Sequence, residues 1–184
     1  MMNGELVDSF RIPHSSFRIT MKTLVVGLGN PYLTDDGVGV RVAYEVERIL
    51  ASRHLPVTSH HIDVTEASAG GLRLMELMIG YDRVIIADAF TKPGMCQPGR
   101  IQRMTLDDLR VISPTQHSAS AHDTTLVTAL DAGRALGFHL PDEVIIYAIE
   151  VENVLDFSEE PTTAVAAAIP PVVKAVLQEL NSIA

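Results

Sequence analysis

Short apolar runs alternate with amphipathic segments along most of the chain. Runs of this kind are typical of strands buried within a parallel sheet, and they cover residues 22–27, 57–63, 82–89 and 143–150. Between the first two runs, residues 38–52 place Val38, Val42 and Val46 on one helical face, with charged residues elsewhere. The alternation predicts strands that are separated by helices.

The remaining pattern completes an α/β fold. We expect a short edge strand at 100–104, one helical turn at 106–109, and helices at 71–79, 123–136 and 162–180, the last bent or divided by two prolines. Strands joined by helices predict a three-layer α/β/α sandwich around a central, mostly parallel twisted sheet of about five strands. We assign residues 21–184 to this single domain. Residues 1–20 lack the features of a secretory signal, and we expect a weakly ordered extension there.

Glycines follow the first predicted strand, at the edge where ligands bind in such sheets. Residues 27–39 read GLGNPYLTDDGVG, which lacks the third glycine of the dinucleotide fingerprint G-x-G-x-x-G. Two acids, Asp35 and Asp36, stand where a diphosphate would need backbone N–H groups and no negative charge. The segment therefore argues against dinucleotide binding. Asn30 can bond neighbouring backbone groups in this turn.

Acidic and imidazole side chains gather at the same predicted edge. One of Asp35 and Asp36 is enough to cap the following helix, which leaves the other carboxylate for chemistry. Asp88 directly follows an apolar strand, and His122 follows a small, polar segment, where His117 competes for the same role. Two carboxylates and one imidazole suit a borderline divalent metal such as nickel or zinc.

Composition and charge narrow the classes of partner. The 184 residues include 14 Lys and Arg against 23 Asp and Glu, a formal net charge of -9 that disfavours nucleic acid and anionic membranes. No apolar run approaches the roughly 20 residues that span a bilayer. The single cysteine, Cys96, excludes an internal disulfide and a thiolate-only zinc site, and it favours a reducing, cytoplasmic location.

Three segments resemble a known family: VVGLGNPYLTDDGVGVRV, YDRVIIADA and SAHDTTLVTAL. They are similar to segments of the hydrogenase maturation proteases, endopeptidases that trim the C-terminal extension from the large subunit of nickel–iron hydrogenases. The resemblance runs from about residue 21 to the C-terminal helix. It implies a hydrolase that acts on a large-subunit precursor after nickel insertion, as an aspartyl-type protease without a Ser or Cys nucleophile. We expect a monomer.

The resemblance also assigns roles to individual residues. It implies that Asp36, Asp88 and His122 contact a nickel ion carried by the substrate precursor, and that Asp36 and Asp88 are catalytic. Which carboxylate acts as the base stays open. Asn30 and Asp35 are expected to hold the loop and orient Asp36. The chain departs from the family at residues 66–71, where EASAGG replaces D-G-G-T-x-G and puts a peptide-docking role of that loop in question.

Two other functions share parts of this pattern. Peptidyl-tRNA hydrolases also open with a strand followed by G-L-G-N-P, but they place a histidine soon afterwards and need a basic face, whereas this chain is acidic. A non-catalytic metal- or nucleotide-binding α/β module would explain a crevice at the sheet edge. It has no use for three converging metal ligands.

Overall fold

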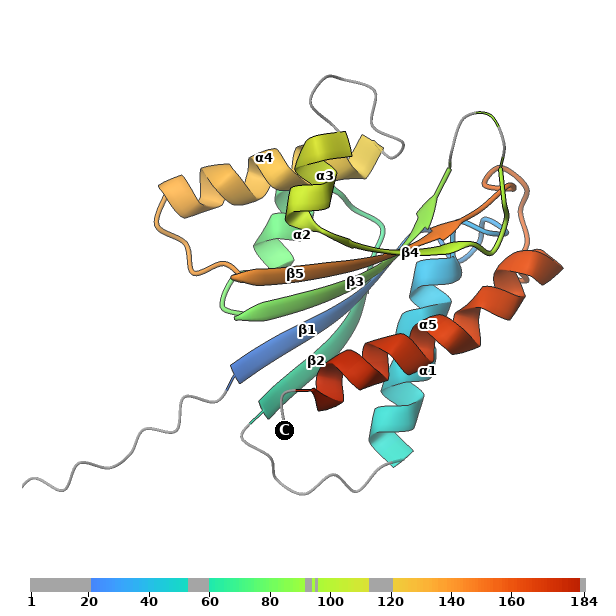
Figure 1. Cartoon of the computed structure of the whole chain (residues 1–184), viewed down its shortest axis with the longest axis horizontal. Coiled ribbons are helices and arrows are strands. Elements are labelled where there is room, and N and C mark those ends of the chain that lie inside the picture. The colour runs from blue at the N-terminus through green and yellow to red at the C-terminus, as the bar shows by residue number, and fades with distance from the viewer. Residues whose placement is uncertain (1–20, 53–59, 92–93, 95, 113–120, 183–184) are drawn as a thin grey trace, which may run out of the picture.

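The computed structural model describes residues 21–52, 60–91, 94, 96–112 and 121–182, without the side chains of residues 112 and 121–125. Figure 1 shows a central sheet with helices on both sides. In chain order the elements are β1 (Met21–Leu28), α1 (Val38–Ser52), β2 (His60–Ala67), α2 (Gly71–Leu77), β3 (Arg83–Phe90), β4 (Ile101–Thr105), α3 (Leu106–Ile112), α4 (Ala121–Ala135), β5 (Glu143–Glu150) and α5 (Thr163–Asn181).

The five strands form one sheet in the order β2-β1-β3-β5-β4. The first four run parallel, whereas β4 pairs antiparallel with β5 at the edge. From β1 the chain crosses to β2 on one side and then returns to β3 on the other side of β1. The connection therefore reverses direction between β1 and β3, and the predicted fold class is confirmed.

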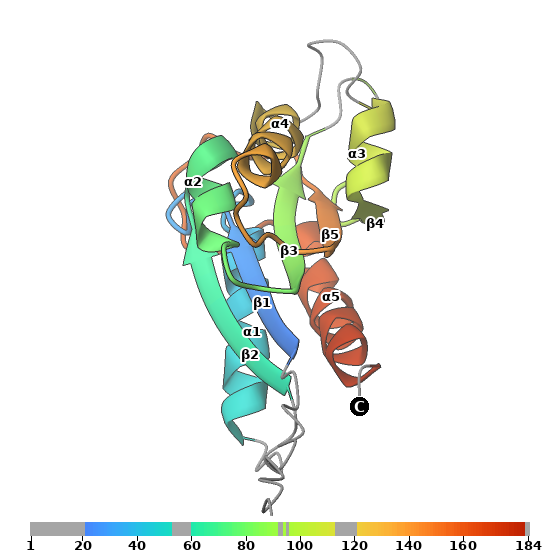
Figure 2. The ribbon, with the colours of Figure 1, turned by 90° about the vertical axis from the view of Figure 1, so that its left-hand side faces the viewer.

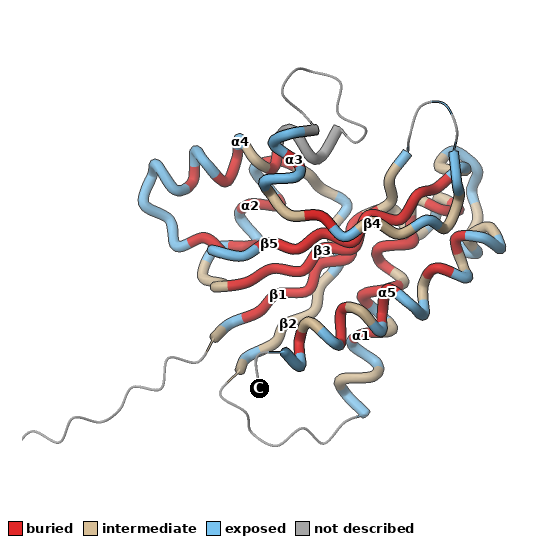
Figure 3. Tube along the Cα trace, in the orientation of Figure 1, coloured by how far each residue is buried: buried red, intermediate tan, exposed pale blue. Residues whose placement is uncertain are grey.

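Two apolar cores lie on the two faces of the sheet. Val25, Ile85 and Ile145 belong to the core that α1 and α5 cover. Their neighbours along each strand point to the opposite face and belong to the core that includes α2, α3 and α4. Figure 2 shows the helices on either side of the sheet, and Figure 3 shows the central strands buried along most of their length.

Glycines let the first turn of α1 touch the sheet backbone. A Cβ atom on Gly39 would lie 2.2 Å from the carbonyl oxygen of Ala87 and 2.4 Å from that of Leu28. On the facing strand, a Cβ atom on Gly27 would lie 2.3 Å from the oxygen of Gly39. The glycine pattern after β1 thus serves the close approach of helix and sheet, a use that needs no bound dinucleotide.

Several element bounds differ from the sequence prediction. The second strand is described over His60–Ala67 and ends four residues beyond the predicted end at 63, so the first two residues of the divergent segment EASAGG belong to β2. Residues 57–59 of the predicted strand lie outside the described residues. Helix α3 is a full helix of seven residues, where one turn was expected. Helix α4 begins at Ala121, which places His122 within its first turn rather than ahead of it. Residues 1–20 lie outside the described residues, and so does His117.

Helix α5 continues through both prolines instead of dividing there. Buried residues on either side of the pair, Ala168 and Val172, pack into the same core and hold one helix axis. Among the residues that the structure describes, α5 is also the one helix long and apolar enough to cross a membrane, contrary to the sequence estimate. One face of α5, which includes Val165, Val172 and Val176, is buried in the core on the sheet.

A cluster of charged side chains joins the C-terminal end of α5 to the sheet. Glu179 accepts hydrogen bonds from Arg83 Nη2 at 2.7 Å, Arg103 Nε at 2.8 Å and Tyr147 Oη at 3.2 Å. Burial alone would raise the pKa of Glu179, but the hydrogen bond and charge of Arg103, with the bonds from Tyr147 and Arg83, outweigh it and lower that pKa. The Arg83 side chain is buried, so this contact ties the helix to the start of β3.

We predict that Glu179→Gln lowers the free energy of unfolding by about 1–3 kcal/mol at neutral pH, because it removes one of the two carboxylates that pair with the buried Arg83 and leaves only Glu143. A carboxyl with a lowered pKa stabilises the fold above its unfolded-chain pKa, and the contribution is lost as the pH falls through the lowered value. The difference between wild type and variant should therefore shrink in acid. Urea unfolding at several pH values measures it.

The matched control is Glu45→Gln, which removes an exposed ion pair with Arg48. It should change the free energy of unfolding by less than about 0.5 kcal/mol. Equal effects of the two substitutions would contradict the structural role of Glu179.

Candidate active site

The candidate site lies where the direction of the chain crossings reverses, between the carboxyl ends of β1 and β3. In open α/β sheets this switch point is where ligands bind. Asp36 stands in the loop that follows β1, and Asp88 lies near the end of β3. The contact of Gly39 with Ala87 brings these two segments together, because Gly39 follows Asp36 by one helical turn and Ala87 immediately precedes Asp88.

The loop after β1 holds Asp36 by its own backbone. Asp36 Oδ2 accepts a hydrogen bond from the Asn30 N–H at 2.7 Å, and Asn30 Oδ1 accepts one from Tyr32 N–H at 3.1 Å. Gly29 has φ +125, and a Cβ atom there would lie 1.9 Å from the Asp36 backbone oxygen. Within the described part of the chain, Asp36 Oδ1 accepts no hydrogen bond, and the side chain is partly exposed. One carboxylate oxygen is fixed and the other is available.

Asp35 is fully buried, with 0% of its surface exposed. Its carboxylate accepts hydrogen bonds from Asn153 N–H at 3.1 Å, from Thr162 N–H at 2.7 Å and from the Thr162 hydroxyl at 3.2 Å. The Asp35 N–H in turn donates to Asn153 O at 2.9 Å. Asp35 thus joins the β1–α1 loop to the β5–α5 loop. The Asp35 backbone oxygen accepts the first α1 N–H, that of Val38, at 3.1 Å. Among the described residues neither the Asp35 nor the Asp36 carboxylate accepts an α1 backbone N–H, so the side-chain cap considered from sequence is wrong for both acids.

Asp88 is buried, with 8% of its surface exposed. Strand alternation places it on the same sheet face as Val84 and Ile86, the face that α4 covers. The first turn of α4 contains His122, whose side chain lies outside the described residues. Among the described side chains, no three His, Cys, Asp or Glu residues are arranged to hold a metal ion. The described part of the site supplies two carboxylates, and the predicted triad stays a prediction.

Glu150, which is not among the predicted site residues, is a third buried acid at this edge. It is 0% exposed, its Oε1 accepts the Gln97 N–H at 2.8 Å, and its Oε2 has no hydrogen-bond partner among the described residues. Phe90 is its register partner, so Glu150 lies two residues beyond the partner of Asp88. The sequence does carry a signal for Glu150: like Asp88, it is an acid that directly follows a run of apolar strand residues.

The lone cysteine lies beside this acid. Desolvation, followed by the charge and hydrogen bond of Glu150, raises the pKa of the Cys96 thiol. The thiol donates to Val151 O at 3.4 Å. A thiol held protonated is a poor nucleophile, which argues against a catalytic role for Cys96.

The divergent segment after β2 makes its own contacts with the site. Ser68 donates from its hydroxyl to Gly29 O at 2.9 Å, and Gly29 N–H donates to Ala67 O at 3.2 Å. The Tyr44 hydroxyl on α1 donates to Glu66, and this bond raises the Tyr44 pKa. A serine hydroxyl thus braces the glycine turn that positions Asp36.

We predict that Asp35→Asn lowers the free energy of unfolding by about 1–3 kcal/mol, because an amide NH₂ then faces a buried N–H donor. Chemical unfolding measures the change. Asp156→Asn is the matched control, since Asp156 is exposed and bonds only the Asn153 side chain through its carboxylate. An unchanged stability of Asp35→Asn would contradict the link between the two loops.

Comparisons with known proteins show the family of this chain. Residues 40–179 match the family model described as hydrogenase maturation protease, which includes Asp88 and begins four residues after Asp36. The chain is 29% identical over 165 residues to the hydrogenase 2 maturation protease of Escherichia coli, covering 88% of this chain and 92% of that protein. It is 26% identical to the hydrogenase expression/formation protein HupD of Rhizobium leguminosarum, covering 88% and 75%.

Solved structures share the fold. The hydrogenase maturating endopeptidase HybD from E. coli superposes with a TM-score of 0.69 at 27% identity, covering 88% of this chain and 93% of that one. A nickel–iron hydrogenase maturation protease from Thermococcus kodakarensis, at 22% identity, shares the fold with a TM-score of 0.61 over 86% and 98%. The two alternatives considered from sequence have no such support. The chain therefore belongs to the hydrogenase maturation protease family and is a peptidase.

Proposed function

We propose that this peptidase removes the C-terminal extension from the large-subunit precursor of a nickel–iron hydrogenase, after nickel has been inserted. The observation that carries the proposal is the pair Asp36 and Asp88 at the switch point between β1 and β3. The names of its relatives, a hydrogenase 2 maturation protease among them, support the kind of substrate.

The proposed roles follow from the environment of each carboxylate. Asp36 has one oxygen fixed by Asn30 N–H, so its second oxygen can face the substrate without turning of the side chain. Asp88 is buried on the α4 side of the sheet, where water has little access. Together they would flank a substrate segment from two adjacent strands. We propose that Asp36, Asp88 and His122 contact the nickel that the precursor carries.

The donor set fits such an ion. Two carboxylates and an imidazole suit a borderline divalent metal. Substrate-borne nickel would polarise a carbonyl or a water close to the bond that is cut. The protein's own part is to orient that bond and to accept a proton on one of the two carboxylates.

We predict that Asp36→Asn and Asp88→Asn each lower the cleavage rate of a nickel-loaded precursor by about 100-fold or more, because each removes an anionic group at the reacting centre. Mass spectrometry of the released C-terminal peptide measures the rate. Asp142→Asn is the control, since Asp142 is exposed and precedes β5 at the opposite end of the sheet. Variants that cleave as fast as wild type would contradict the site assignment.

Nickel dependence is a separate prediction. Precursor prepared without nickel should remain uncut by wild-type protein, and reloading it with nickel should restore cleavage, because the proposed recognition needs the ion in the substrate. The same gel or mass measurement follows both reactions. Equal cleavage of loaded and unloaded precursor would show that the ion is not recognised.

A further inference from the structure

An exposed apolar surface lies beside the candidate active site. It consists of Tyr32 from the β1–α1 loop and of Leu155 and Phe157 from the β5–α5 loop, and we call it the rim patch. Leu155 is 83% exposed, Phe157 is 86% exposed and Tyr32 is 62% exposed. Large apolar side chains left together in water commonly mark a binding surface. Tyr32 precedes Asp36 by four residues, so the patch includes a residue of the loop that carries Asp36.

The backbone beneath the rim patch is held in place. Leu33 and Phe157 form an antiparallel β-bridge, and Ser158 N–H donates to Tyr32 O at 3.1 Å. Thr34 bonds Asp156 O through its N–H at 3.1 Å and through its hydroxyl at 2.7 Å. The two loops therefore act as one supported platform. The patch is exposed because its side chains point away from that platform, and not because the loop has come away from the fold.

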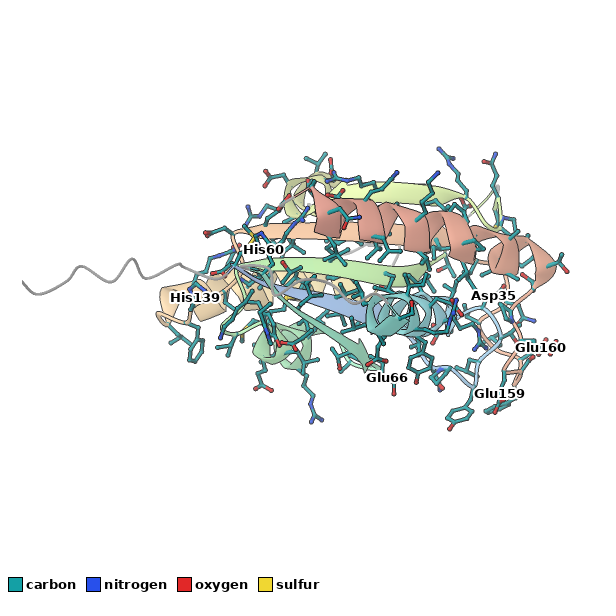
Figure 4. The ribbon with its side chains drawn as sticks, turned by 90° about the horizontal axis from the view of Figure 1, so that it is seen from below. Asp35, His60, Glu66, His139, Glu159 and Glu160 are labelled. Atoms are coloured by element: carbon teal, nitrogen blue, oxygen red, sulfur yellow. The ribbon has the colours of Figure 1, made fainter. Side chains whose placement is uncertain are left out.

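Acidic side chains surround the apolar centre. Residues 152–160 read ENVLDFSEE, with acids at 152, 156, 159 and 160 and no Lys or Arg. Figure 4 shows Glu159 and Glu160 at the same end of the molecule as Asp35, far from His60 and His139. The nearby cation Arg41 donates to the backbone oxygens of Glu159 and Pro31. Its guanidinium supports the loop, and the surroundings of the patch stay acidic.

We propose that the rim patch docks an apolar, positively charged segment of the large-subunit precursor next to the bond that is cut. The inference rests on the proposed function, and it names the chemistry of the segment that this surface selects. Apolar contact with Leu155 and Phe157 would supply the affinity. The acids around them would attract Lys or Arg of the segment and set its orientation.

Steady-state cleavage of nickel-loaded precursor by the double variant Leu155→Ser/Phe157→Ser tests the proposal. KM should rise about tenfold or more while kcat stays within about twofold of wild type, because the patch binds substrate without touching the reacting bond. Leu136→Ser is the matched control, since Leu136 is 75% exposed near the opposite end of the sheet. Thermal unfolding of the double variant should match wild type, because both side chains are exposed.

Charge is tested by Glu159→Lys/Glu160→Lys. This variant should raise KM most at low ionic strength and progressively less as salt screens the attraction. A KM that is the same for wild type, Leu155→Ser/Phe157→Ser and Leu136→Ser would overturn the docking surface while leaving the proposed cleavage intact.

Failure of the proposed function has a different signature. A precursor that wild-type protein leaves uncut contradicts the cleavage. Binding of that uncut precursor, measured by calorimetry, then decides the docking surface. Weaker binding by the double variant supports it, and equal binding by both proteins overturns it.

Discussion

The arrangement of the site depends on the buried carboxylate of Asp35. It accepts hydrogen bonds from the backbone of Asn153 and Thr162, which belong to a loop more than one hundred residues away in sequence. A fully buried carboxylate is stable only when its oxygens are satisfied by donors, and here both oxygens are engaged. The same contact fixes the start of α5 relative to the start of α1. The contact thus holds the loop of Asp36 and Tyr32 against the loop of Leu155 and Phe157.

The two neighbouring acids of the segment TDDG divide the work between structure and chemistry. Asp35 faces inward to the second loop, whereas Asp36 turns back to the Asn30 N–H and keeps one oxygen available. Adjacent residues can do this because the chain between β1 and α1 is held by glycines at 29 and 37, where a side chain would collide with backbone. The glycines of this turn therefore serve to position two acidic side chains, and no bound dinucleotide phosphate is needed to explain them.

The sequence predicted the fold well where burial dominates. The bounds of β5 and α1 match the prediction, because continuous apolar runs and a clear helical face mark them. The bounds of β2 do not, because this edge strand is only half buried and its pattern HHIDVTEA carries little apolar signal. The burial of the acids at the candidate site was equally hard to predict from the sequence. Asp88 and Glu150 each follow a run of apolar residues within their strands. The burial of Glu150, however, depends on the packing of residues 96–100 over β5, which the sequence pattern does not reveal.

The distribution of charge separates the two ends of the sheet. At the amino end of β3, Arg83 and Arg103 pair with Glu143 and Glu179 in a cluster that joins α5 to the sheet. At the carboxyl end, Asp35, Asp88 and Glu150 are buried, and the loop that carries Leu155 and Phe157 holds further acids at 152, 156, 159 and 160. With the net charge of -9 distributed in this way, the paired charges at the amino end of the strands stabilise the fold, and the acids at the carboxyl end attract a cationic partner. The proposed docking of a cationic substrate segment would use this polarity, because long-range attraction would bring the site end of the enzyme to that segment.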